Sequence, residues 1–252
     1  MLYPMNGSTR YEEIDVIRGI AVFMMVIFHA VFDLSFFGIS AIEVSTGFWR
    51  SFALATASLF LLLAGISLTI SDARAGKKHD VPHRFLRSLK RGATIFGLGL
   101  LVTLATWLYL KEGYVIFGIL HLIGISIILG WFFLRLGKWN LPLGIAWIIT
   151  GVAIVSQIRG PLALAWIGMY PGGFSSVDYT PLFPWFGVFL AGIGLGTLLY
   201  PGGKREWQVP RLNEPIARAL AFPGRHSLII YLVHQPVILF IIQLTTGTRL
   251  LF

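Results

Sequence analysis

Four ionisable residues share one face of the first apolar stretch of the chain: Asp15, Arg18, His29 and Asp33. At roughly 100° per residue they fall within about 60° of one another on a helical wheel. His29 and Asp33 are four positions apart and so occupy adjacent turns. A carboxylate at that spacing can hold one imidazole nitrogen and leave the other as a base or nucleophile. We therefore predict that His29 and Asp33 are catalytic.

The same face also has a structural interpretation, in which a buried polar pair only fixes helix packing. An ionisable group costs at least ~2.5–3.5 kcal/mol at the centre of a membrane helix, which favours a functional role. Arg18 lies near the membrane boundary. It either binds an anion or anchors the helix, with Asp15 as its partner.

The last apolar stretch repeats this pattern, because Ser227, Tyr231 and His234 recur at i, i+4 and i+7. Pro236 cannot donate a hydrogen bond to the carbonyl of Leu232, which opens the helix locally. We predict that Tyr231 and His234 contact a bound substrate. A hydrogen-bonded packing cluster is the alternative.

Two further groups are candidates for the site. His121, in the apolar segment GILHLIGIS, is predicted near the depth of His29, either as a catalytic residue or as a structural histidine. Arg84, Arg87 and Arg91 form a basic segment that can hold phosphates. Membrane topology explains the same charges, so both interpretations stay open.

The elements that carry these residues are membrane-spanning helices. The chain has 252 residues, of which 56% are hydrophobic, and its apolar runs have the length needed to cross a bilayer. We predict an all-α transmembrane bundle with about seven spans, forming one domain over residues 1–252. The spans are expected at residues 14–38, 48–71, 92–110, 115–136, 141–158, 182–200 and 227–245. The absence of cysteine excludes disulfides and thiolate metal sites, and we expect no metal.

The distribution of positive charge predicts a cytoplasmic N-terminus. With these spans, sixteen of the 20 Lys and Arg residues fall on the inner side and four on the outer side. This bias also accounts for the net charge of +9, so we expect no nucleic-acid partner. The protein is predicted to be a multi-pass protein of the cell membrane.

Smaller patterns predict local structure. Asp80 and Pro82 indicate a capped helix start that continues into the third span. Residues 210–225 are expected to form a short helix at the membrane interface. Gly192 and Gly196 form a small-residue face for close helix contact.

Three segments together resemble the prokaryotic branch of the heparan-α-glucosaminide N-acetyltransferase-like family of transmembrane acyltransferases. They are RYEEIDVIRGIAVFMMVIFHAVFD, DYTPLFPWFGVFLAGIGLGTLLYP and GRHSLIIYLVHQP. Asp15 and Arg18 match the family's D-x-x-R-G opening, and His29 falls where the lysosomal enzyme has a catalytically implicated Asn. The lysosomal enzyme also has a catalytic His in its first luminal segment. Residues 38–50 hold no His here, so if a His serves that role in this chain, His29 or His121 must supply it.

The resemblance implies an enzyme that takes an acetyl or other acyl group from cytoplasmic acyl-CoA and passes it to an acceptor on the opposite face. The acceptor is expected to be a small molecule or glycan with a sugar hydroxyl or amine. In this hypothesis His29, Asp33 and His121 carry the chemistry. The residues expected to bind the CoA co-substrate are Arg18, Arg84, Arg87, Arg91, Arg225, Tyr231 and His234.

Two other functions remain open from the sequence. A proton-coupled transporter or channel would use His29 and Asp33 as a proton relay. A non-enzymatic scaffold would need the polar residues only for stability. Lipid is an expected partner in each case, and a homodimer is an option that the sequence leaves open.

Overall fold

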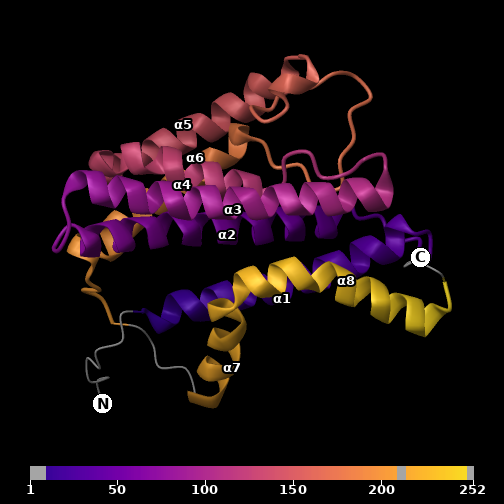
Figure 1. Ribbon diagram of the computed structural model, residues 1–252, viewed down its shortest axis with the longest axis horizontal. Helices are drawn as coiled ribbons and strands as arrows, with labels where there is room; N and C mark the ends of the chain where they lie inside the picture. Colours follow the sequence, from indigo (N-terminus) through magenta and orange to yellow (C-terminus); the bar gives the residue numbers. More distant parts are fainter. Residues whose placement is uncertain (1–9, 209–213, 249–252) are drawn as a thin grey trace. The chain divides into compact units, whose positions relative to one another are not determined.

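The computed structural model describes residues 10–208 and 214–248 of the chain, and its regular structure is helical (Figure 1). The α-helices are α1 (Glu12–Phe36), α2 (Gly47–Ala75), α3 (Val81–Leu110), α4 (Ile119–Phe133), α5 (Asn140–Ala153), α6 (Leu182–Leu199), α7 (Glu214–Arg225) and α8 (Ser227–Thr246). Strand pairing among the described residues is limited to two isolated bridges, Phe117 with Tyr179 and Arg159 with Tyr170. The all-α prediction is confirmed.

Six helical stretches in the described part of the chain are long and apolar enough to cross a membrane. One of them, Ile119–Gln157, has 39 residues and is interrupted by a 3₁₀ segment, Leu134–Trp139, where Gly137 has a φ of 52°. This interruption divides the stretch into α4 and α5, so each of the seven predicted spans corresponds to an α-helix. The cytoplasmic N-terminus stays a prediction.

The chain divides into two compact units, with the boundary inside α2. Unit 1 comprises Met1–Phe60 and Gln208–Phe252, and unit 2 comprises Leu61–Trp207. The single domain expected over residues 1–252 stays a prediction.

In unit 1, α7 and α8 both pack on α1. The contact with α7 is very close, because a Cβ on Gly19 would overlap the carbonyl oxygen of Leu220. Val16 packs there against Ala217 and Ala221, which are buried. The predicted helix over 210–225 is confirmed from Glu214 onward, and residues 210–213 lie outside the described part of the chain.

In unit 2, α4 packs on α3 and on α6, and α5 packs on α6 (Figure 1). Large fully buried side chains from three helices make the core: Leu61, Leu122, Ile127, Phe186, Phe189, Leu190 and Ile193. A Cβ on Gly192 would overlap the carbonyl oxygen of Leu62 in α2. One on Gly196 would lie 3.0 Å from the Cα atom of Ile66. The predicted close-packing role of these two glycines is confirmed.

The start of α3 carries the basic segment. The Asp80 carboxylate accepts a hydrogen bond from the backbone N–H of His83 at 3.2 Å, and a proline lies in the first turn. An acidic N-cap accepts a hydrogen bond from an otherwise unpaired N–H group, and its negative charge interacts favourably with the positive end of the helix dipole. The predicted capped start is confirmed: α3 begins at Val81 and continues into the span predicted over residues 92–110.

Candidate functional site

The polar face of α1 is turned away from the exposed surface. Asp15 and Asp33 are 4% and 2% exposed, whereas Phe23 and Ile27 on the other side of the helix are about half exposed. His29 is half-buried. An apolar face that can meet lipid and a protected polar face are what a membrane helix with ionisable side chains requires.

His29 is held by the backbone of its own helix. Its Nδ1 lies 2.9 Å from the carbonyl oxygen of Met25, to which only an N–H can donate. Nδ1 therefore carries the proton, and Nε2 of the neutral ring keeps a bare lone pair. An imidazole in this tautomer is prepared to accept a proton at Nε2.

The hydrogen bond predicted between His29 and Asp33 is not formed, which corrects that part of the sequence-based hypothesis. The physical reason is the direction of helical side chains, which lean toward the N-terminus of their helix. The His29 ring therefore reaches back to Met25, and Asp33 finds its partner on another helix.

That partner is Gln235 of α8, whose Nε2 donates to Oδ1 of Asp33 at 3.2 Å. The two residues are 202 positions apart in the chain. Sequence reasoning did not include Gln235 among the site residues. The available signal was its position next to His234 in the segment VHQP.

His234 places a second imidazole against the first. The ring centroids of His29 and His234 are 4.7 Å apart, with an interplanar angle of 76°. Nδ1 of His234 lies 2.6 Å from the carbonyl oxygen of Tyr231, so this ring also carries its proton on Nδ1. Tyr231 is half-buried, with its ring centroid 5.5 Å from that of His234. The structure thus brings together His29, Tyr231 and His234.

Three buried atoms of this histidine cluster (His29, Asp33, His234 and Gln235) have no hydrogen-bond partner among the described residues. They are Oδ2 of Asp33, Nε2 of His234 and Oε1 of Gln235. All three are acceptors. A buried polar group without a partner costs about 1–3 kcal/mol, and most buried groups have one. The cluster is therefore organised to receive hydrogen-bond donors that the chain does not supply.

A second set of predicted residues meets at the junction of α1, α7 and α8. Asp15 accepts hydrogen bonds from Arg18 at 3.1 Å and from Nε of Arg225 at 3.3 Å. The structure brings these two arginines together on one carboxylate. That carboxylate offsets part of the charge that they offer to an anion.

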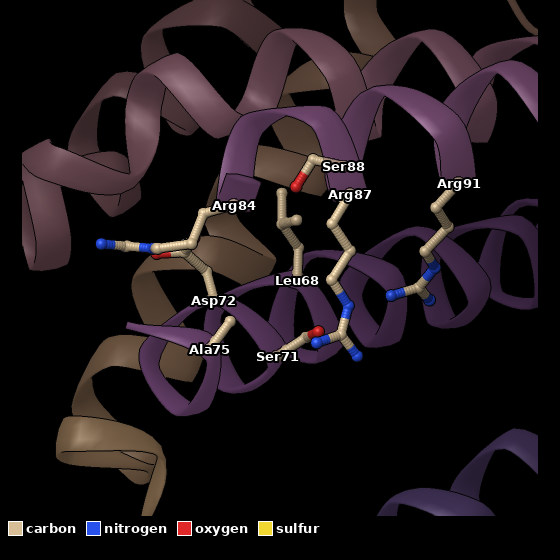
Figure 2. A pocket seen from close by; sticks show the side chains of 8 residues that line it. All are labelled: Leu68, Ser71, Asp72, Ala75, Arg84, Arg87, Ser88 and Arg91. Carbon is tan, nitrogen blue, oxygen red and sulfur yellow. Dashed lines mark hydrogen bonds and ion pairs between the residues drawn. The ribbon is translucent and has the colours of Figure 1, made fainter. Parts of the chain in front are cut away.

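The other predicted arginines lie in unit 2, around a surface hollow of about 280 Å³ that includes open solvent. Figure 2 shows the side chains of its lining residues, which are Leu68, Ser71, Asp72, Ala75, Arg84, Arg87, Ser88 and Arg91. Arg87 and Arg91 lie one turn apart on α3, and both extend toward α2. Guanidinium groups with neighbouring hydroxyls are groups that bind phosphate oxygens.

Asp72 organises one side of the arginine hollow. Nε of Arg84 donates a hydrogen bond to Oδ1 of Asp72 at 3.0 Å, and Nη2 of Arg84 donates to Oδ2 of the same carboxylate. The lining of the hollow thus holds three arginines and one carboxylate, which is paired with Arg84. Sequence reasoning missed Ser71, Asp72 and Ser88, because their contribution depends on the pairing of α2 with α3.

His121 has a different environment from His29. It is 2% exposed, and its Nδ1 accepts a hydrogen bond from the backbone N–H of Gly118 at 3.2 Å. Its Nε2 lies 3.4 Å from the hydroxyl of Thr103. Both ring nitrogens are thus occupied, and the residue caps the start of α4. Its geometry favours the structural alternative, and the catalytic role of His121 stays a prediction.

The loop before α6 contacts the start of α4, where His121 lies. Oδ2 of Asp178 accepts a hydrogen bond from the backbone N–H of Ile119 at 3.1 Å, which adds a second cap to α4. The hydroxyl of Tyr179 donates to the carbonyl oxygen of Ala165 at 2.7 Å. Desolvation, followed by the neighbouring Tyr170, raises the pKa of Tyr179. These bonds hold the loop in place, and the one from Ile119 fixes it to the start of α4, the helix that carries His121.

The fold and the two polar sites define the class of the protein: a polytopic helical membrane protein with a buried histidine cluster and a basic hollow. The family model described as "Heparan-alpha-glucosaminide N-acetyltransferase, catalytic" matches residues 10–236. The chain therefore belongs to this family of membrane acetyltransferases, as its resemblance predicted. Searches among curated proteins and among solved structures found no significant match.

Proposed function

We propose that the protein transfers an acetyl or other acyl group from cytoplasmic acyl-CoA to a sugar hydroxyl or amine on the outer face of the cell membrane. Membership of an acetyltransferase family supports the reaction class. The observation that carries the mechanism is the tautomer of His29, which leaves a bare Nε2 in a protected polar cluster.

His29 serves as the general base in this proposal. Its Nε2 takes the proton of the acceptor hydroxyl or amine as the acceptor atom attacks the thioester carbonyl. The hydrogen bond from Nδ1 to Met25 fixes the ring and its tautomer. Asp33, held by Gln235, supplies a negative charge that stabilises the imidazolium once it forms.

The phosphates of the donor bind in the arginine hollow. CoA carries a diphosphate and a phosphate monoester, and these groups need cations and hydrogen-bond donors. The hollow offers three arginines and two serines against a single Asp72. Arg18 and Arg225 were predicted for the same role, and their shared Asp15 makes them weaker candidates. The base and the phosphate site are separate assignments, each with its own test.

A radiolabelled acetyl-CoA assay with glucosamine as the probe acceptor tests the function. We expect His29→Ala to reduce transfer by roughly 10²–10⁴-fold, the usual contribution of a general base. His79→Ala removes an exposed histidine of the α2–α3 connection and should retain activity. Full activity of His29→Ala would end the proposed role of His29.

Proton-coupled transport is the second candidate, and the contact between His29 and His234 favours it, because adjacent imidazoles beside a carboxylate can pass protons. In that case acyl-CoA should neither bind nor be consumed. A pH gradient should then drive flux in liposomes that contain the purified protein. Thermal stabilisation by CoA and acetyl-CoA, without such flux, would favour the enzyme.

A further inference from the structure

His234 has no role as a base in the function proposed above, yet its geometry matches that of His29. Each ring donates from Nδ1 to a backbone carbonyl of its own helix and keeps Nε2 bare. His234 is more deeply placed, at 6% exposure, and its Nε2 is buried without a partner in the described part of the chain. A buried ring nitrogen without a hydrogen-bond partner costs free energy. Binding of a group that donates a hydrogen bond to it is therefore favourable.

Acyl transfer from a thioester needs a second proton transfer. When the carbon–sulfur bond breaks, its electron pair leaves with sulfur, and the thiol of cysteine, a comparable group, has a pKa of about 8.5. A thiolate released in a site shielded from water is costly unless it is protonated or paired with a cation. A histidine beside the leaving sulfur solves this problem, since a thiolate is stabilised next to an imidazolium.

We infer that His234 is a second catalytic residue, which delivers the acceptor's proton to the CoA sulfur. The inference rests on the proposed acyl transfer. Attack of the acceptor forms the new bond to the acyl carbon, and Nε2 of His29 takes the acceptor's proton. That proton passes to Nε2 of His234 at the ring contact. When the carbon–sulfur bond breaks, His234 gives the proton to sulfur, and both rings return to their starting tautomers.

His29 and Asp33 are the ionisable groups that the structure links to His234. The His29 ring contacts the His234 ring, and Asp33 accepts a hydrogen bond from Gln235, the chain neighbour of His234. Arg225, nine residues before His234 in sequence, is paired with Asp15 of α1.

Binding of the product CoA isolates the last step without any acceptor. In the product complex the CoA thiol donates a hydrogen bond to the bare Nε2 of His234. We expect the full-length protein in detergent to bind CoA about tenfold more tightly than desulfo-CoA, which lacks the sulfur and leaves Nε2 buried without a partner.

The informative variant is His234→Asn, because the Asn amide nitrogen can keep the hydrogen bond to Tyr231 while Nε2 is removed. We expect it to lose the preference for CoA over desulfo-CoA while it still binds desulfo-CoA. The matched control His79→Asn changes an exposed histidine of the α2–α3 connection and should retain the preference.

Three outcomes would overturn the inference. A preference for CoA that persists in His234→Asn, or equal binding of CoA and desulfo-CoA by the wild-type protein, would remove the role of His234 alone. Failure of the wild-type protein to bind either CoA or desulfo-CoA would refute the donor assignment as well, and so the proposed function. His234→Gln provides a second variant should the Asn protein fail to fold.

Discussion

The histidine cluster of unit 1 and the arginine hollow of unit 2 are opposite in their chemistry. The unpartnered atoms of the cluster are all acceptors, and they are buried. The hollow is open to solvent and is lined by guanidinium donors. A phosphate is thus suited to the hollow, whereas a hydroxyl or amine that carries a proton is suited to the cluster. The difference indicates two separate tasks, anion binding and proton transfer.

The largest expected effect is on the proton-transfer side of this comparison. We expect His29→Asn and His234→Asn each to slow acyl transfer by roughly 10²–10⁴-fold. The double variant should lose little more than either single one, because residues that act in one sequence are strongly non-additive. Steady-state transfer rates for the four proteins check this. Independent, multiplicative losses would contradict a shared proton path.

A smaller effect is expected on the anion-binding side. Arg87→Gln should raise the KM for acetyl-CoA about tenfold with little change in kcat, because it removes a charge-assisted contact made equally before and during reaction. Lys90→Gln removes the same charge from α3 outside the lining of the hollow and is the matched control. Equal effects of the two variants would reduce the hollow to a general basic surface.

The contact between Asp33 and Gln235 should couple α1 to α8 in stability. Removing one partner leaves the other buried and unpaired, whereas removing both does not. We expect Asp33→Leu and Gln235→Leu to cost about 1–3 kcal/mol each in the free energy of unfolding, and the double variant to cost less than their sum. Denaturant unfolding in detergent measures the cycle. Strict additivity would show that the hydrogen bond does not hold the cluster together.

The smallest effect concerns the helix end that presents the basic segment. The side-chain hydrogen bond with His83, followed by the backbone hydrogen bond to the same residue, lowers the pKa of Asp80 below its ordinary 3.8. A carboxyl group whose pKa is lower in the folded than in the unfolded state stabilises the fold at pH values above its unfolded-state pKa. This stabilisation is lost as the pH falls through its folded-state pKa. We expect hydrogen exchange at the start of α3 to accelerate below about pH 4. Asp80→Asn should weaken this pH dependence, and an unchanged profile would contradict the cap.

The sequence was sufficient for the helices, because apolar length and charge placement depend on local composition. It was also sufficient for local contacts such as the Asp80 cap. It failed where a side chain had two possible partners, as for His29, which bonds Met25 instead of Asp33. Contacts that join distant segments, such as Gln235 with Asp33, leave no local pattern. The role of His121 at Gly118 was open for the same reason, since its spacing fits both a cap and a catalytic residue.

The protonation of the two facing imidazoles is the most direct test of the account. Nitrogen NMR of the protein labelled with ¹⁵N-histidine distinguishes a protonated ring nitrogen from a bare one. In the ligand-free protein near neutral pH, we expect Nδ1 of His29 and of His234 to carry the proton and both Nε2 atoms to be bare. Histidine-to-asparagine variants at the two positions assign the signals. A proton on Nε2 of His29 would contradict the account, because the proposed base would then have no lone pair to offer.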